Sequence, residues 1–581
     1  MNVAKSSLKI FGARVCKAVC SFSAVVVFSR EVGAAPLGTY YPFLALLGIV
    51  GLPAGLGLAH ATQKRISEDD DSAAYLGTAI VLKLLPLLGV AAVSLAAGDY
   101  VNRFLGADLV TLFVATLLVS SVGDFALGVL RGELRVGETA ILEVIRPLSW
   151  LVVGYLLYRQ GYGVRALVYG YFVGSVLVAT IGWWKVSTPV GRPTVEHARS
   201  LFEYARFSVI SSIGGYFYSW TDVGVLTLFV VLGAGVTRAD VGAYENAWRL
   251  SLVVTLFGKS IATTLFPQIS RWDAEDATEK IESAIPTALL PSLLVVVPAF
   301  VGSIVLAKDL LGVLFGPEFV VAWLALIVLA GGKIPESVHI LLTQALNAID
   351  RPDLAAYASI TSAGLNLLLN VVLIWQFGLV GAAVATTVSF ALNTAIHAHY
   401  LTQFLELRLP FREAAWSVVA SAVMGGAVYG VRTLIELETV VQLFAIILFG
   451  AAVYATLVLA HGPVRMEARR TLGPLLSEYS LERTRRTGAG RGKQFSYSRR
   501  QFEHGPTNAG GTTRGQGHPE VGLSLVSPHG LAERAGVSLE RRDRHRTGDD
   551  VRHRKPVRGR RQQPGGVTPA DGTLGRHHDP R

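Results

Sequence analysis

The sequence has few charged residues and almost no cysteine. Charged residues make up 16% of the 581 positions and hydrophobic residues 51%, whereas a soluble domain carries about 25% charged residues. The 2 cysteines, Cys16 and Cys20, share one helix face in the first apolar segment, with no histidine or carboxylate cluster beside them. We interpret them as small apolar packing residues rather than as a metal pair. The composition therefore predicts a lipid-embedded chain without a metal site.

Sequence patterns typical of catalysis are also missing. Residues 256–260 end like a phosphate-binding loop, but Val253 stands where the first glycine belongs, and the segment lies in an apolar helix. No spaced His/Cys set and no nucleophile elbow occurs. The connections between apolar segments are too short for a soluble catalytic domain. We therefore expect neither enzymatic activity nor a cofactor.

Apolar segments of membrane-spanning length recur along the first 460 residues. A span needs about 20 mostly apolar residues, and this length predicts about fourteen spans. They lie at 8–29, 38–60, 75–97, 109–130, 139–158, 164–186, 207–233, 241–264, 284–306, 320–346, 355–375, 379–401, 414–433 and 438–460. Lys and Arg number 18 on one side and 7 on the other, so the positive-inside rule places both termini in the cytoplasm.

Short motifs recur between the two halves of the chain. Residues 37–40 and 241–244 both have glycine second and tyrosine fourth, and 104–106 resembles 314–316. Arg135 and Arg351 follow at equivalent places. Because an even number of spans separates the equivalents, the halves share one orientation, as in transporters with parallel repeats. We predict an all-α membrane protein with two six-helix lobes around a central cavity. Its parts are an N-terminal lobe (1–186), a cytoplasmic linker (187–206), a C-terminal lobe (207–401), two further spans (402–460) and a basic tail (461–581).

The net charge of +11 lies wholly in the C-terminal tail. Residues 481–581 contain 21 Lys and Arg against 10 Asp and Glu. A stretch so poor in apolar residues buries too little surface to fold, so we expect it to be disordered. It either binds anionic lipid headgroups or is an unselected extension, and we favour the second interpretation. The charge gives no reason to expect a nucleic-acid partner.

Ionisable residues within the predicted spans are the candidates for function. Arg14 lies in the first span, Asp222 ends a serine stripe in the seventh, Glu245 and Arg249 lie in the eighth, and Lys333 lies in the tenth. A charge at the bilayer centre costs about 2.5–3.5 kcal/mol, so such residues face a cavity or one another. Their number favours a hydrated, cationic cavity that accepts an anionic cargo.

Structural interpretations of these residues remain open beside the functional one. Serine and asparagine stripes also serve helix packing. Glu245 and Arg249, and likewise Glu143 and Arg146, have spacings at which helical residues neutralise one another. Lys17 and Lys259 have side chains long enough to reach a membrane interface.

Several motifs resemble those of polysaccharide flippases. These are the Gly-x-Tyr openings of the second and eighth spans and the residues 314–319, 345–352 and 378–383. They are similar to members of the multidrug/oligosaccharidyl-lipid/polysaccharide exporter superfamily over about residues 1–460. The resemblance implies alternating access without ATP hydrolysis. It also implies that the chain moves a polyprenyl- or dolichyl-phosphate-linked saccharide from the inner to the outer leaflet of the cytoplasmic membrane.

The resemblance also suggests roles for the charged residues. Arg14 and Arg249 are expected to contact the phosphate or pyrophosphate, with Lys333 in support. Asp222 and Glu245 are expected to couple an ion or to hold the cations in place. The expected partners are the lipid-linked saccharide, membrane lipids and glycan assembly enzymes, and the expected state is a monomer.

Three other functions are compatible with a chain of this kind. An ion-coupled small-molecule or drug exporter of the same superfamily would have an acidic cavity in its N-terminal lobe. A membrane glycosyltransferase or polymerase that uses the same lipid carrier would have a long outer loop with catalytic carboxylates. A scaffold that has lost transport would depend on its tail for partners.

Overall fold

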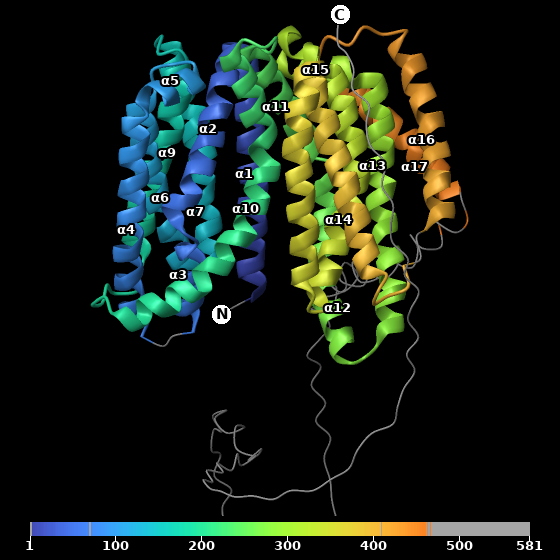
Figure 1. The fold of residues 1–581 in the computed structure, drawn as a ribbon. Coiled ribbons are helices and arrows are strands. Elements are labelled where there is room, and N and C mark those ends of the chain that lie inside the picture. The colour runs from blue at the N-terminus through green and yellow to red at the C-terminus, as the bar shows by residue number, and fades with distance from the viewer. Residues whose placement is uncertain (1–2, 69–70, 408–409, 461, 463–464, 466–581) are drawn as a thin grey trace, which may run out of the picture. The chain divides into compact units, whose positions relative to one another are not determined.

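The computed structural model describes a helical chain. It covers residues 3–68, 71–407, 410–460, 462 and 465, and within these the side chains of 3–11 and 207–218 are not described. The predicted disordered tail lies almost wholly outside the described residues. The helices are α1 Val3–Val32, α2 Ala34–Gly55, α3 Leu58–Ser67, α4 Ser72–Ala96, α5 Gly98–Leu105, α6 Val110–Gly132, α7 Val136–Ser149, η1 Trp150–Gly154, α8 Tyr155–Arg159, α9 Val164–Lys185, α10 Val195–Leu232, α11 Arg238–Leu252, α12 Thr255–Ala274, α13 Thr278–Phe315, η2 Pro317–Ala322, α14 Trp323–Ala348, α15 Pro352–Leu401, α16 Phe411–Arg432 and α17 Val440–Ala460 (Figure 1).

The described helices match the predicted spans in position. Among the described residues, 11 helices are long and apolar enough to cross a membrane, and α11 with α12, bent by 47°, makes up to 12. The all-helical membrane fold is thus confirmed. The predicted number of fourteen spans stays a prediction. It differs from the count of 11 to 12 at two helices, α15 and α10.

The first of these helices, α15, is a hairpin rather than one long span. It has 50 residues, and Gly378 interrupts it with φ 56° and ψ −133°. Asn366 Nδ2 donates a hydrogen bond to Thr386 Oγ1 at 3.2 Å, although a straight helix would separate these residues by about 30 Å. A Cβ on Gly381 would lie 2.0 Å from the Leu373 carbonyl oxygen. The two halves therefore run antiparallel, as the predicted spans 355–375 and 379–401 require.

The second helix, α10, joins the linker to the seventh predicted span. It begins at Val195, where the Thr194 side chain accepts a hydrogen bond from the His197 N–H at 3.2 Å, an ordinary N-cap. The second half of the predicted linker 187–206 is therefore helical. The predicted stripe residues Ser208, Ser211, Ser212 and Gly215 lie outside the described side chains.

The two Gly-x-Tyr motifs form the contact between α2 and α11. A Cβ on Gly38 would lie 1.7 Å from the Arg238 carbonyl oxygen, and one on Gly242 would lie 2.1 Å from that of Ala34. Beside them, the Tyr41 hydroxyl donates to Asn246 Oδ1 at 2.6 Å. The absence of side chains at both glycines thus lets the backbones of the two halves touch.

Arg30 and Arg238 each donate hydrogen bonds to a helix end in the other half of the chain, at the same, predicted outer, end. Arg30 at the end of α1 donates to the Leu314 carbonyl at 3.1 Å and to that of Val313, at the end of α13. Arg238 at the start of α11 donates to the Phe104 carbonyl at 2.6 Å, at the end of α5. The last carbonyls of a helix lack intrahelical partners, so each half of the chain caps a helix of the other.

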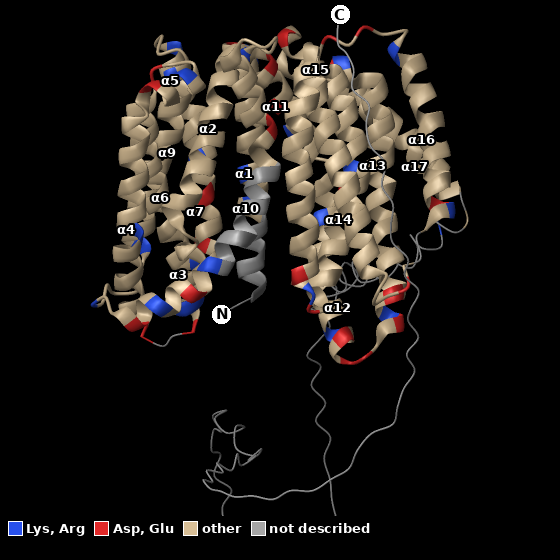
Figure 2. Cartoon of the chain, viewed as in Figure 1, with Lys and Arg blue, Asp and Glu red and all other residues tan. Residues whose placement is uncertain are grey.

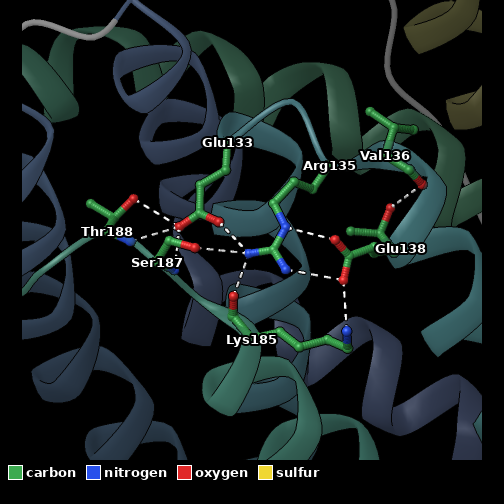
Figure 3. A network of polar contacts seen from close by, with 8 residues as sticks. Glu133, Arg135, Val136, Glu138, Lys185, Ser187 and Thr188 are labelled. Carbon is green, nitrogen blue, oxygen red and sulfur yellow. Dashed lines mark hydrogen bonds and ion pairs between the residues drawn. The ribbon is translucent and has the colours of Figure 1, made fainter. Parts of the chain in front are cut away.

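A polar network at the predicted inner end ties α6 and α7 to the segment after α9 (Figure 3). Glu133 accepts from the Ser187 and Thr188 N–H groups at 2.7 and 2.8 Å. Arg135 pairs with Glu133 at 3.0 Å and with Glu138 at 2.8 Å. Burial raises the pKa of Glu133, but these hydrogen bonds outweigh it, so its pKa lies below the usual value. The network holds the loop that joins two cavity-lining helices.

Candidate anion-binding cavity

Charged residues gather at the two ends of the helices, with few between (Figure 2). Two adjoining cavities lie in the N-terminal half. The first cavity measures about 380 Å³, and the second, which extends to α3, about 550 Å³. Six residues line both: Leu44, Asp124, Leu127, Arg131, Arg146 and Tyr171.

One face of α7 forms a wall of the first cavity. Glu143, Arg146, Pro147 and Trp150 line it, at spacings of three, four and seven residues that put them on one side of a helix. Pro147 has no N–H to donate, and directly after it Trp150–Gly154 forms a π-helical turn. Such turns are frequent at functional sites. The helix is therefore wider at the end of this cavity wall.

The carboxylates of the cavities are already paired. Glu143 binds Lys17 of α1 at 2.8 Å and Arg131 of α6 at 2.6 Å. Asp124 of α6 binds Arg146 at 2.7 Å. The Glu143–Arg146 pair that the sequence left open is thus not formed, because cations from neighbouring helices approach Glu143 and Asp124 pairs with Arg146 across the α6–α7 contact.

Arg249 brings a cation from the second half of the chain into the first cavity. It lies on α11, whereas the other described residues that line this cavity come from helices that precede α10. Its Nη2 pairs with Glu245 Oε1 at 2.8 Å, and its guanidinium lies 4.9 Å from the centre of the Tyr41 ring. The expected Glu245–Arg249 pair is therefore formed, and Arg249 also faces the cavity.

The described lining of the two cavities is cationic. It contains five basic side chains and two carboxylates: Lys17, Lys83, Arg131, Arg146 and Arg249 against Asp124 and Glu143. Arg146 Nε and Nη2 and Arg249 Nε are buried without a hydrogen-bond partner among the described residues. Unpaired buried donors are costly, and a planar guanidinium fits phosphate oxygens well. The geometry therefore suits an oxyanion.

Arg14 and Lys333 lie elsewhere in this conformation. Arg14 is exposed and is not among the residues that line the two cavities. Lys333 is 1% exposed, pairs with Glu336 at 2.6 Å and lies 3.8 Å from the centre of the Trp248 ring. Their expected contact with phosphate stays a prediction.

Asp222 lies in a separate buried cluster between α10, α11 and α15. It accepts hydrogen bonds from the Tyr244 hydroxyl, from Thr386 Oγ1 at 2.7 Å and from Asn370 Nδ2 at 2.8 Å. All three donors are neutral, and no cation lies at ion-pair distance among the described residues. Asp222 therefore forms no ion pair with Arg249, whereas Glu245 does, and the roles expected of both residues stay predictions.

The residues that sequence reasoning missed as site residues are Lys83, Asp124, Arg131 and Arg146. A signal was present at 143–150, where charged, proline and aromatic residues share one helix face. No sequence pattern points to Arg131 or Asp124, because their place in the cavity depends on ion pairs between α6 and α7. Arg131 lies one residue beyond the predicted fourth span, 109–130.

Comparison with known proteins agrees with this architecture. A family model described as lipid II flippase MurJ matches residues 72–450. The chain belongs to this family. It is 42% identical over 472 residues to the probable low-salt glycan biosynthesis flippase Agl15 of Haloferax volcanii, covering 81% of this chain and 99% of the relative.

Solved structures show the same fold. The lipid II flippase MurJ in an inward closed conformation superposes with a TM-score of 0.67 at 15% identity, over 79% of this chain and 98% of the other. An inward-facing multidrug transporter of the MATE family and MOP superfamily gives a TM-score of 0.56 at 17% identity, over 67% and 94%. The resemblance drawn from the sequence motifs is confirmed, and the chain is a multi-pass membrane protein of a flippase family rather than an enzyme.

Proposed function

We propose that this protein flips a lipid-linked saccharide across the cytoplasmic membrane by alternating access. The observation that carries the proposal is the surplus of basic side chains in the two cavities, with unpaired guanidinium donors from both halves of the chain. A phosphate or pyrophosphate group needs such donors, since an unpaired charge in a low-dielectric region is expensive. The named relatives are flippases, one of them for glycan biosynthesis.

Arg249 and Arg146 would contact the phosphate in this mechanism. They lie on opposite halves of the chain and line the same cavity, so a bound phosphate would bridge the two lobes. The contact of α2 with α11 at the predicted outer end and the extension of the second cavity to α3 support a state that would load from the cytoplasmic side. Arg14 and Lys333 would reach the substrate only after the lobes rearrange.

Asp222 would couple transport to an ion. A carboxylate surrounded by hydroxyl and amide groups, without a basic partner, either takes up a proton or offers oxygen ligands to a cation. The cluster joins α10, α11 and both halves of α15, so occupancy there would alter how these helices pack. Glu245 would balance the charge of Arg249.

A drug exporter is less well supported. A cationic drug needs a free carboxylate, but Asp124 and Glu143 are both paired with cations. The termini in the cytoplasm, the monomeric state and a link to glycan assembly enzymes belong to this proposal as expectations.

Proteoliposomes that contain the purified full-length chain and radiolabelled dolichyl phosphate-linked glucose test the function. Membrane-impermeant periodate oxidises only the saccharide in the outer leaflet. We expect the whole pool to become accessible with the protein, and only the outer-leaflet fraction in protein-free vesicles or with Arg249→Ala. Equal accessibility in all three samples would exclude flipping of this substrate.

A further inference from the structure

Lys83 is a buried cation that the phosphate site does not use. It lies on α4 and is 7% exposed, while Val81 and Leu84 on the same helix are 53% and 49% exposed. It lines the second cavity and is not among the lining residues of the first. The side chain therefore points into the protein rather than towards lipid.

The ammonium group of Lys83 forms no ion pair among the described residues. Its Nζ lies 5.3 Å from the centre of the Phe125 ring. The charge of Asp124 acts on Lys83, but Asp124 forms its ion pair with Arg146 at 2.7 Å. An ammonium group within a membrane protein is expensive unless a partner or water satisfies its three donors. Lys83 thus offers an unused positive charge to whatever enters the second cavity.

The second cavity also has uncharged hydrogen-bonding side chains that the first cavity lacks. Gln63, Ser120 and Ser121 line it, and amide and hydroxyl groups of this kind match the hydroxyl groups of sugars. The first cavity instead carries Lys17 and Arg249, which do not line the second. A head group that fills both cavities would thus meet Arg249 in the first cavity and Lys83 in the second, with Arg131 and Arg146 common to both.

We propose that Lys83 forms a second anion subsite, which binds an oxyanion of the substrate head group other than the phosphate held by Arg249 and Arg146. This inference rests on the proposed function. The oxyanion is either an acidic group on the saccharide, such as a carboxylate, or the second phosphate of a pyrophosphate carrier. In both cases the protein selects substrates with an additional negative charge beyond the first phosphate.

Binding of three defined lipids by the purified full-length protein tests this subsite. The probes are dolichyl phosphate-linked glucose, dolichyl phosphate-linked glucuronic acid and dolichyl pyrophosphate-linked glucose. Quenching of tryptophan fluorescence reports binding, since Trp150 and Trp220 line the cavities. We expect wild type to bind at least one of the doubly charged probes about tenfold more tightly than the singly charged one, as one charge-assisted hydrogen bond provides.

Lys83→Gln should remove that tenfold preference, so that the doubly charged probes bind no more tightly than dolichyl phosphate-linked glucose. Lys83→Arg should retain the preference. Lys259→Gln should retain it as well, because Lys259 is an exposed lysine of α12 that lines neither cavity. Loss of preference for the glucuronic acid probe assigns the subsite to the saccharide, and loss for the pyrophosphate probe assigns it to the carrier.

Three results would overturn the inference. Equal affinities of the wild-type protein for all three probes would overturn the inference before any variant is measured. A preference that persists in Lys83→Gln, or an equal weakening of all three probes, also overturns it while the proposed function stands. Absence of binding of every probe to wild type would instead contradict the proposed function itself.

Discussion

Gly38 and Gly242 occupy equivalent positions in the two halves of the chain and lie against each other's helix. A Cβ on Gly242 would lie 3.0 Å from the Gly38 nitrogen and 2.1 Å from the Ala34 carbonyl oxygen. Small residues at helix crossings allow backbones in membranes to approach closely. The motif repeated in the sequence is therefore the place where the two lobes meet.

Gly38→Ala and Gly242→Ala should open the predicted outer end. The added methyl group overlaps backbone atoms that have no room to move, so the contact of α2 with α11 should separate. We expect faster labelling of a cysteine placed at Thr39 by a membrane-impermeant maleimide, and slower flipping. Gly302→Ala is the control, because a Cβ there meets nothing within 4 Å. Unchanged labelling in both variants would show that the contact does not close this end.

Arg30→Gln and Arg238→Gln should weaken the same closure. Each removes hydrogen bonds from a charged donor to helix-end carbonyls. Such a bond contributes about 1.5–3 kcal/mol when it is buried. The contribution here is smaller, because both sites are partly exposed. Spin labels on the outer ends of α5 and α11 should show a longer distance in the double variant. Arg159→Gln, which removes an exposed side chain with a 3.9 Å ion pair, should leave the distance unchanged.

Arg249→Ala should lower both stability and transport. It leaves Glu245 buried without its cation, and breaking a buried pair in this way costs about 3–5 kcal/mol. The double variant Glu245→Gln/Arg249→Met should recover the melting temperature in detergent but not the flipping rate. Recovery of both would place Arg249 in a structural role alone.

Asp222→Asn should leave the fold intact and abolish ion dependence. The amide oxygen still accepts from Thr386 and Tyr244, but the group neither takes up a proton nor carries the charge that attracts a cation. We expect flipping in proteoliposomes that no longer responds to an imposed sodium or proton gradient. Asp309→Asn is the matched control, since Asp309 pairs with Arg432 at 2.7 Å and is not part of the Asp222 cluster. A response to the gradient like that of wild type would remove Asp222 from coupling.

The Glu133 network predicts an acid-sensitive contribution to stability. Because the folded pKa of Glu133 lies below its usual value, its stabilising effect is present above the pKa of the unfolded chain, about 4.3. It is lost as pH falls through the folded value. We expect Glu133→Gln to flatten the fall in melting temperature below about pH 4.3, with little change of slope at neutral pH. An identical pH profile would exclude this contribution.

The fold could be predicted from the sequence because it depends on local rules. Runs of about 20 apolar residues located the helices, and even the turn of α15 lies between the segments 355–375 and 379–401. Glycine at 378, with its positive φ, permits that turn. The paired Gly-x-Tyr motifs indicated two related halves, since repeats preserve their contact residues.

The candidate site could be predicted from the sequence only in part. Sequence alone determined that Arg249, Glu245 and Asp222 lie inside the membrane and need partners, because charge in a low-dielectric region is costly wherever the helices pack. The tertiary structure decided which charges meet: Arg146 with Asp124, Glu143 with Lys17 and Arg131. It also left Lys83 without an ion pair, and it buried Lys333 against Glu336. These pairings depend on the relative rotation and approach of neighbouring helices, which side-chain packing between distant segments sets and no local pattern records.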